Sequence, residues 1–430
     1  MNIWIFNHYA DTPDRPSTRT FDLSKQLVQR GHSVTIFAAG FSHYSLKEER
    51  IRPGKTWHEE DWNGVRFIWL KTFPYRENGW RRMLNIVTFA WRAFWRARKL
   101  RETPDAIIGT TVHPLAALCA YTLSVVKKSR FFFEVTDLWP ETLIDMGALS
   151  SGSPTAAAMR VLEKFLYRRA EKTIMLWPFA YEYTVSLGIP RDKIVWIPHG
   201  VDLSRLEKLE PYDGGISSPF TVMFLGGQSK YHGADVILDA AKLLQEENEG
   251  RVRFVIVGDG AEKSRLVQRA REMNLQAVEF RPLVPKSDIA KVMGEADAFI
   301  FHIRELALLR KYGISANKLY DYMSSGRPVI YAVNSRNNPI EEARAGVSIP
   351  SENPRALADS VLRVLSLTPA ARIQMGQNGL KYLLKHHDIR ILAEQLEQVL
   401  LGSSLKGASH GDTQRGPRIE TSAIHDEARI

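Results

Sequence analysis

The amino-acid sequence predicts an α/β protein with two doubly wound domains that face a central cleft. Its 430 residues exceed what one hydrophobic core usually covers. Short apolar runs alternate with segments of helical periodicity, which is typical of parallel sheets covered by helices. A polar stretch rich in Pro, Gly and Ser at 210–219 interrupts this alternation. We therefore expect a domain boundary close to this stretch.

The first domain is expected to span residues 1–205, where apolar runs predict seven strands. These runs lie at 3–6, 34–38, 65–70, 106–108, 131–135, 173–176 and 194–197. Segments with helical spacing separate them, for example at 21–30 and 156–169. The order of strand and helix predicts a sheet with helices on both faces.

The second domain is expected to span residues 206–385 and to repeat the pattern. Strands are predicted at 221–225, 252–257, 278–280, 298–301, 328–331 and 347–349, and helices at 234–247, 263–273, 286–294, 317–324 and 354–365. A last helix, at about 386–401, is expected to pack back on the first domain. The tail at 402–430 has too little apolar content to fold, so we expect it to be disordered.

Composition narrows the class of protein. The single cysteine, Cys119, cannot form an internal disulfide and fits a reducing, cytoplasmic setting. No apolar run approaches the roughly 20 residues of a membrane-spanning helix, and the N-terminal segment lacks the pattern of a signal peptide. We also find no Asp-X-Asp pair and no His or Cys cluster with ligand spacing. No metal or other cofactor is therefore expected.

The net charge of +10 is concentrated in one segment, 71–101, which carries nine Lys or Arg against one acid and is rich in Trp and Phe. Basic and aromatic residues on helical spacing suit the surface of an anionic membrane. The expected membrane contacts are Trp80, Arg81, Arg82, Trp91, Arg92, Trp95 and Arg96. Alternatively, the aromatic residues pack into the core and the arginines are merely solvated. Nucleic acid is not an expected partner, because no finger, RNP or basic-zipper pattern is present.

The segment that begins at Ser315 reads as loop, helix, Gly-Arg-Pro stop and apolar strand. A helix start offers unpaired N–H groups and partial positive charge, and Lys318 adds a cation, so this segment suits a pyrophosphate. Asp321, one turn later, is placed to accept hydrogen bonds from sugar hydroxyls. We expect Asn317 and Leu319 to contribute to the same nucleotide-sugar site. In the alternative, Ser315 or Asn317 only caps a helix that packs inward.

Glycine-rich or polar turns follow three predicted strands of the second domain. Glycine allows a backbone to approach a phosphate closely, and a neighbouring Lys or His would supply charge. The residues expected to bind the donor there are Gly226, Gly227, Lys230, His232, Gly258, Gly260, Arg281 and Leu283. Each turn alone is also compatible with a simple connection between strand and helix.

Together these motifs resemble the family 4 glycosyltransferases of the GT-B fold, in the branch that builds bacterial surface polysaccharides. The resemblance covers roughly residues 1–400 and rests on six motifs. They are Arg19 in its Ser-Thr-Arg-Thr-Phe context, Gly31-His32, Asp-Leu-Trp-Pro-Glu at 137–141, Pro-His-Gly-Val-Asp at 198–202, Val-Gly-Asp-Gly at 257–260, and the segment 315–323.

The resemblance implies a retaining transfer of sugar from a nucleotide-sugar, with UDP preferred, to a polyprenyl-diphosphate saccharide. The setting would be O-antigen, capsule or exopolysaccharide synthesis on the inner face of the cytoplasmic membrane, without an obligatory metal. Lys318, Asp321 and His113 would be catalytic, although His113 is also placed to cap a helix. The residues expected to bind the acceptor are Arg19, Asp137, Trp139 and Glu141.

Two positions depart from the family pattern. The family pairs two glutamates eight positions apart, whereas here Gly313 takes the first position and Asp321 the second. The usual Arg and Lys of the glycine-rich loop fall on Gly227 and His232. These departures imply a different contact to the donor sugar. A GT-B sugar-nucleotide epimerase and a non-catalytic scaffold at the membrane remain alternative functions.

Overall fold

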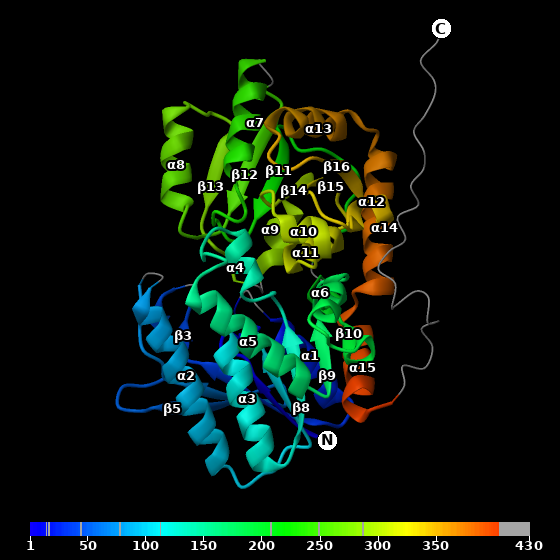
Figure 1. Cartoon of the computed structure of the whole chain (residues 1–430). Coiled ribbons are helices and arrows are strands. Elements are labelled where there is room, and N and C mark those ends of the chain that lie inside the picture. The colour runs from blue at the N-terminus through cyan, green and yellow to red at the C-terminus, as the bar shows by residue number, and fades with distance from the viewer. Residues whose placement is uncertain are drawn as a thin grey trace.

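The computed structural model describes residues 1–403 except 14, 16, 17, 44, 77, 78, 112, 207, 208, 248, 249, 286 and 287. The disorder expected for the tail therefore concerns residues that lie almost entirely outside the described part. The described chain forms two lobes, each with a sheet between two layers of helices (Figure 1). This is the doubly wound α/β architecture that the alternation of strands and helices predicts.

The first lobe contains an eight-stranded sheet in the order β10-β9-β8-β7-β1-β2-β6-β5. Its strands are β1 (Asn2–Phe6), β2 (Ser33–Ala39), β5 (Trp57–Trp62), β6 (Val65–Leu70), β7 (Ala106–Thr110), β8 (Arg130–Val135), β9 (Lys172–Met175) and β10 (Ile194–Trp196). Neighbours are parallel except for β5 and β6. The sequence analysis did not predict β5, because its charged residues hide the strand pattern. Such residues are typical of an exposed edge. A short antiparallel pair, β3 (Phe41–Ser42) and β4 (Lys47–Glu48), lies beside the sheet.

The second lobe contains six parallel strands in the order β13-β12-β11-β14-β15-β16. They are β11 (Phe220–Leu225), β12 (Val252–Val257), β13 (Val278–Arg281), β14 (Ala298–His302), β15 (Val329–Ala332) and β16 (Gly346–Ile349). In chain order within the lobe this is the 3-2-1-4-5-6 arrangement of dinucleotide-binding folds. Its order reverses between β11 and β14. Ligands bind open α/β sheets at such a switch point, beyond the carboxyl ends of the strands.

Helices cover both faces of the first sheet. One face carries α2 (Trp80–Lys99), α3 (Pro114–Lys127), α5 (Pro154–Arg169) and α6 (Ala180–Ser186). The other carries α1 (Arg19–Gln29) and α15 (Ile389–Leu401). A short helix, α4 (Glu141–Asp145), follows β8, and 3₁₀ turns lie at Arg191–Lys193 and Leu203–Leu206.

Helices also cover both faces of the second sheet. One face carries α7 (Asp235–Glu246), α8 (Lys263–Glu272) and α13 (Pro354–Ser366). The other carries α9 (Ile289–Gly294), α10 (Ala307–Tyr312), α11 (Asn317–Ser324), α12 (Pro339–Ala343) and α14 (Pro369–His386). The helix expected at 286–294 is described from Ile289 onward.

The chain crosses between the lobes twice, and the two crossings are hydrogen-bonded to each other. Val201 N donates to His387 O at 2.9 Å, and Ile389 N donates to Val201 O at 3.2 Å. The imidazole of His387 also stacks on Tyr320 of α11, with ring centroids 3.9 Å apart. Beyond this junction α15 returns to the first lobe, where Leu396 is buried against α1 and the sheet (Figure 1).

Candidate functional site

The loops after β11 and β12 touch through their backbones beside the switch point between β11 and β14. Gly226 N donates to Val257 O at 2.8 Å, and Gly226, Gly258 and Gly260 all have positive φ values, of 141°, 138° and 153°. A Cβ on Gly258 would lie 2.0 Å from Gly226 O, and one on Gly260 would lie 2.2 Å from Gln228 O. Glycine is required here because the loops approach each other this closely.

Lys318 lies over the first of these loops. It is the second residue of α11, whose N-cap residue, Ala316, makes no side-chain capping hydrogen bond. The lysine stem lies against Gly226, where an added Cβ would be 2.2 Å from Cε of Lys318. Its Nζ lies 3.4 Å from Gly227 O and 5.0 Å from the centroid of the Phe224 ring. A cation and a helix start without a side-chain cap therefore meet at one point.

His232 is the closest hydrogen-bond partner of the lysine. Nζ of Lys318 donates to Nε2 of His232 at 2.9 Å, so the ring is neutral and its Nδ1 donates to Ser229 Oγ at 2.9 Å. Burial lowers the pKa of Lys318 to about 7. Burial, and then the charge of Lys318, lowers the pKa of His232 well below its usual value. The pair is thus poorly solvated, and a bound anion would stabilise its positive charge.

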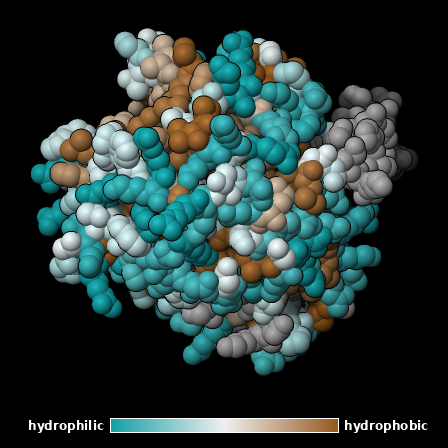
Figure 2. Space-filling view, turned by 90° about the horizontal axis from the view of Figure 1, so that it is seen from below, coloured by the Kyte–Doolittle hydropathy of each residue, from teal (hydrophilic) through white to brown (hydrophobic). Residues whose placement is uncertain are grey.

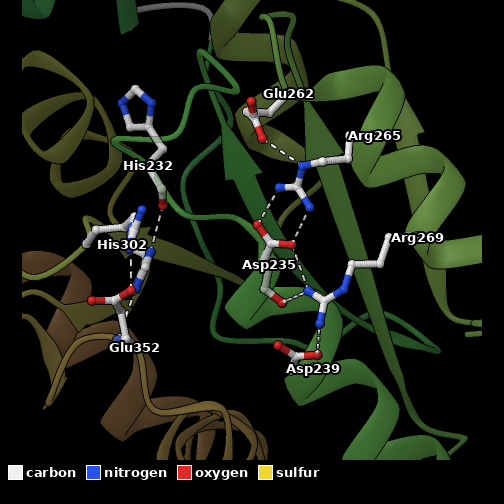
Figure 3. A network of polar contacts seen from close by, with 9 residues as sticks. His232, Asp235, Asp239, Glu262, Arg265, Arg269, His302 and Glu352 are labelled. Atoms are coloured by element: carbon white, nitrogen blue, oxygen red, sulfur yellow. Dashed lines mark hydrogen bonds and ion pairs between the residues drawn. The ribbon is translucent and has the colours of Figure 1, made fainter. Parts of the chain in front are cut away.

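Polar contacts fix the segments behind this pair (Figure 3). His302 of β14 donates from Nδ1 to the carbonyl of His232 at 2.7 Å and accepts from Glu352 N at 3.2 Å. Asp235 at the start of α7 receives both Nη groups of Arg265 of α8, at 2.8 and 2.6 Å. Arg269 joins Asp235 to Asp239 at 2.7 Å to each carboxylate. The helices that follow the two glycine loops are therefore tied together.

Several other predicted donor residues already have protein partners. The hydroxyl of Ser315 accepts from His199 N at 2.9 Å, which joins α11 to the crossing between the lobes. The guanidinium of Arg281 pairs with Glu279 and Glu295, at 2.6 Å each. The side chain of Leu319 is fully buried. These side chains therefore have partners or packing within the protein, and their expected contact with the donor stays a prediction.

The donor contacts expected of the remaining residues stay predictions. Asn317 and Asp321 lie half-buried on α11, Lys230 is exposed in the loop after β11, and Leu283 is exposed after β13. The sequence analysis did not single out Gln228, although this residue directly follows the pair Gly226 and Gly227. It is fully buried, and neither atom of its amide has a hydrogen-bond partner among the described residues.

His113 does not face an open cleft, contrary to the expectation for a catalytic residue, because its side chain is buried. It caps α3, accepting from Ala116 N at 3.2 Å, and its other ring nitrogen lies 2.7 Å from Nδ1 of His8. Burial, and then the charge of Arg82, lowers its pKa to about 3. His8 and His113 follow β1 and β7, the strands at which the order of the first sheet reverses. Both side chains are therefore buried beside this switch point.

Arg19, expected to bind the acceptor, is instead an internal brace. It is buried and donates from Nε to Glu134 at 3.1 Å. Its two Nη groups donate to the carbonyls of Pro198 and Ile197, the latter at 3.0 Å. A buried guanidinium requires such partners, and these hold the crossing between the lobes against the first sheet.

A cavity of about 160 Å³ lies between the lobes. Asp137 and Thr142 line it from the first lobe, and Tyr231 from the second. Asp145, at the end of α4, spans the seam and caps α10, accepting from Ala307 N at 3.2 Å and Leu308 N at 2.9 Å. Of the predicted acceptor residues, Asp137 therefore lines an interlobe cavity.

The other two predicted acceptor residues do not line this cavity. Glu141 accepts from Arg160 at 2.8 Å. The indole N–H of the half-buried Trp139 has no partner within the described part of the chain. Among residues 1–403, with the gaps given above, no three His, Cys, Asp or Glu side chains gather as ligands for a metal ion.

The outer face of α2 carries a stripe of exposed apolar residues. Trp80 and Trp91 are 67% and 64% exposed, and Leu84, Val87 and Trp95 continue the stripe. Arg81 and Arg98 lie over the rings of Trp80 and Trp95, at 5.3 Å each. Figure 2, seen from below, shows hydrophobic patches among hydrophilic side chains on this end of the molecule.

Three arginines expected at the membrane are half-buried instead of exposed. Arg92 donates to the carbonyl of Lys71, Arg96 stacks on Trp57 at 3.7 Å, and Arg82 buries its Nε. These contacts turn the guanidinium groups of Arg92 and Arg96 toward protein partners, and Arg82 also interacts within the protein. No helix in the described part of the chain is both long and apolar enough to cross a bilayer.

Comparisons with known proteins match both lobes. Residues 16–200 match the model of the glycosyl transferase 4-like domain, and residues 219–367 match that of the glycosyl transferases group 1. A relative in Escherichia coli (strain K12), WcaI, is named as a candidate colanic acid biosynthesis glycosyl transferase. It is 19% identical over 279 residues, which cover 61% of this chain and 67% of the relative.

Two solved structures share the fold. Sucrose-phosphate synthase from Thermosynechococcus elongatus superposes with a TM-score of 0.73 at 16% identity, covering 93% of this chain and 98% of the other. HepE from Anabaena, solved in complex with UDP-glucose, superposes with a TM-score of 0.66 at 14% identity, covering 94% and 100%.

The two adjacent glycines of the loop after β11 provide a matched test of this packing. Gly226→Ala should lower the free energy of unfolding by about 1–3 kcal/mol, because the new Cβ meets the stem of Lys318 at a strained φ. Gly227→Ala should change it by less than about 1 kcal/mol, because the nearest atom to its Cβ is 3.8 Å away. Equal denaturation midpoints for both variants would contradict this account.

Proposed function

We propose that this chain, which belongs to the glycosyltransferases, is a retaining, metal-independent sugar transferase. Its first lobe matches the glycosyl transferase 4-like domain, its second lobe matches the glycosyl transferases group 1, and the two lobes have the GT-B arrangement. The donor is a nucleotide-sugar with UDP as its nucleotide. The acceptor is a lipid-linked saccharide, carried on a polyprenyl diphosphate, in bacterial surface polysaccharide synthesis. The enzyme works from the inner face of the cytoplasmic membrane.

The contact of Lys318 with His232 over the glycine loop carries this proposal. It lies at the start of α11, whose N-cap residue, Ala316, makes no side-chain capping hydrogen bond. Such a helix start with an adjacent cation suits a diphosphate. The switch point of the second sheet is also where the fold places a nucleotide.

The proposed reaction breaks the bond between the anomeric carbon and the diphosphate oxygen. The acceptor hydroxyl oxygen forms the new bond to that carbon, and its proton passes to the departing diphosphate. Negative charge therefore grows on the diphosphate as the bond stretches. Lys318 and the N–H groups of α11 would stabilise that charge more in the transition state than in the ground state, which lowers the barrier.

Two comparisons support the choice of substrates. HepE, which shares the fold, is described in complex with UDP-glucose, and this favours UDP over other nucleotides. The name of WcaI refers to colanic acid biosynthesis, which favours a surface polysaccharide as the product.

The stripe on α2 supports the membrane part of the proposal. Its exposed Trp side chains would insert at the headgroup level, while Arg81, Arg98 and Lys99 meet anionic lipids. This assignment replaces Arg82, Arg92 and Arg96 as the membrane cations, because these three side chains have contacts within the protein.

Lys318→Ala should lower turnover by about 10²-fold or more, since it removes a preorganised cation from the leaving group. Transfer is measured by mass spectrometry, with a panel of nucleotide-sugars and a polyprenyl-diphosphate saccharide as acceptor. The thermal unfolding temperature of the Lys318→Ala variant should stay close to that of the wild-type protein. Lys381→Ala, at an exposed position on α14 of the same lobe, is the matched control and should retain activity. Full activity in Lys318→Ala would refute the phosphate role.

The affinity for UDP should fall as pH rises above about 7. Below the pKa of Lys318, which is about 7, the free protein already carries the ammonium that the diphosphate needs. Above it, binding must first add a proton, so the affinity falls by up to about tenfold per pH unit. Calorimetric titration at pH 6.5 to 8.5 would measure this dependence. Lys318→Arg, which stays protonated, should flatten the curve. An identical slope in both proteins would contradict the assignment.

Replacing Trp80 and Trp91 by Ser should weaken binding to phosphatidylglycerol vesicles by about tenfold or more, because each exposed Trp loses its interfacial burial. Val161→Ser is the control, because Val161 is 71% exposed on α5 and outside the stripe. Co-sedimentation with vesicles measures the difference. Unaltered binding of the double variant would exclude α2 as the membrane contact.

A further inference from the structure

A second cavity, here called the hinge cavity, lies where the two crossings between the lobes meet α1. Its volume is about 390 Å³. Three segments line it: the positions 25, 26 and 29 of α1, the end of the first crossing at 202–204, and the beginning of α15 at 388–390. It shares no lining residue with the cavity at Asp137, and it does not include the loop or the helix that hold Lys318.

Both lobes contribute to the wall of the hinge cavity. Leu203 packs against a core cluster of the second lobe, whereas Ile389 belongs to a core cluster of the first. Just beside the cavity, Val201 and Asp388 form a parallel bridge between the two crossings. Relative motion is the usual behaviour of lobes joined in this way, and a few residues at the crossings absorb it. A molecule in the hinge cavity would therefore touch both sides of the hinge.

The charged groups in the wall are already neutralised in pairs. Nζ of Lys25 lies 3.6 Å from Oδ2 of Asp202, and Nε of Arg390 donates to Oδ1 of Asp388 at 3.0 Å. The two carboxylates are only 8% and 3% exposed. A charged ligand would compete with one of these pairs and leave a buried group without its partner, which costs free energy. The wall therefore favours a ligand without net charge.

The other polar groups of the wall offer donors next to acceptors. The amides of Gln26 and Gln29 form no hydrogen bond within the described residues, and each amide can both donate and accept. The hydroxyl of Ser204 donates to Asp202 at 2.6 Å and can still accept. Adjacent hydroxyl groups of a saccharide also donate and accept, so they match such a surface. The volume lies near the lower end of the roughly 300–1,000 Å³ of small-molecule pockets, which suits a mono- or disaccharide.

We propose that the hinge cavity binds a neutral mono- or disaccharide, and that the bound saccharide fixes the angle between the two lobes. Gln26, Gln29 and Ser204 are its hydrogen-bond partners, and Leu203 and Ile389 offer apolar surface to its C–H groups. A ligand that fits only one arrangement of the lobes favours that arrangement by its difference in affinity. This site goes beyond the proposed function, because it takes no part in binding the diphosphate or the transferred sugar.

Binding is measured by saturation-transfer NMR and calorimetry with glucose, galactose, lactose and maltose, and with inorganic phosphate as a charged probe. At least one saccharide should bind to the wild-type protein. The double variant Gln26→Leu/Gln29→Leu should weaken this binding by about tenfold or more, since two amide partners are lost. Gln268→Leu, at an exposed position on α8, is the matched control. Lys318→Ala should bind the same saccharide as tightly as the wild-type protein, which separates the hinge cavity from the phosphate seat.

The angle between the lobes is measured with one spin label on each lobe. Cys119 is the only cysteine and is buried, so labels go to Val161→Cys on α5 and Asp359→Cys on α13, both exposed. Saturating saccharide should narrow the distribution of distances between the labels, and should leave it unchanged when the Gln26→Leu/Gln29→Leu substitutions are present.

Four results would overturn the inference. They are no binding of any saccharide, binding that the double glutamine variant leaves unaltered, binding of phosphate in place of the saccharides, and a distribution of distances that the bound saccharide does not change. None of these measurements requires the protein to bind a nucleotide or to transfer a sugar. Failure of this inference is therefore distinguishable from failure of the proposed function.

Discussion

Two close contacts at Gly226 set the geometry of the donor side of the site. The backbone of Gly258 packs closely against the carbonyl of this residue, and the stem of Lys318 packs closely against its Cα. A side chain at Gly258 would separate the loops after β11 and β12, and a side chain at Gly226 would displace the stem of Lys318 from the first of these loops. Lys318 can occupy this position because Gly226 has no side chain. Only glycine leaves room for other groups to pack against its backbone from two directions.

The contact between the lobes depends on hydrogen bonds in which backbone N–H groups donate to side-chain oxygens of the opposite segment. Asp145 of the first lobe caps α10 of the second, and Ser315 of the second lobe accepts from His199 in the crossing. Arg336 of the second lobe adds an ion pair with Glu182, at 2.7 Å. These contacts place the loop after β8 opposite the loop after β11. The interlobe cavity is a consequence of this seam and belongs to neither lobe alone.

Local patterns predicted most of the fold, because buried parallel strands read as apolar runs and α11 begins and ends at clear signals. Residue roles were harder to predict. Arg19 and His113 are types of residue that often bind ligands, yet here one braces the lobe crossing and the other caps α3. A sequence does not reveal whether a buried charged or polar group is satisfied by protein or by ligand. The cavity partners Tyr231 and Trp177 were missed because they meet Asp137 only in the folded chain.

The return of α15 to the first lobe affects the order in which the protein can form. The first lobe buries Leu396 and its neighbours, which leave the ribosome after the whole second lobe. Domains generally fold in order from the N-terminus during synthesis. Here the lobe that is translated first is completed last, and until then the α1 side of its sheet exposes apolar surface. A nascent chain halted before residue 389 would thus carry a complete second lobe beside an incomplete first lobe.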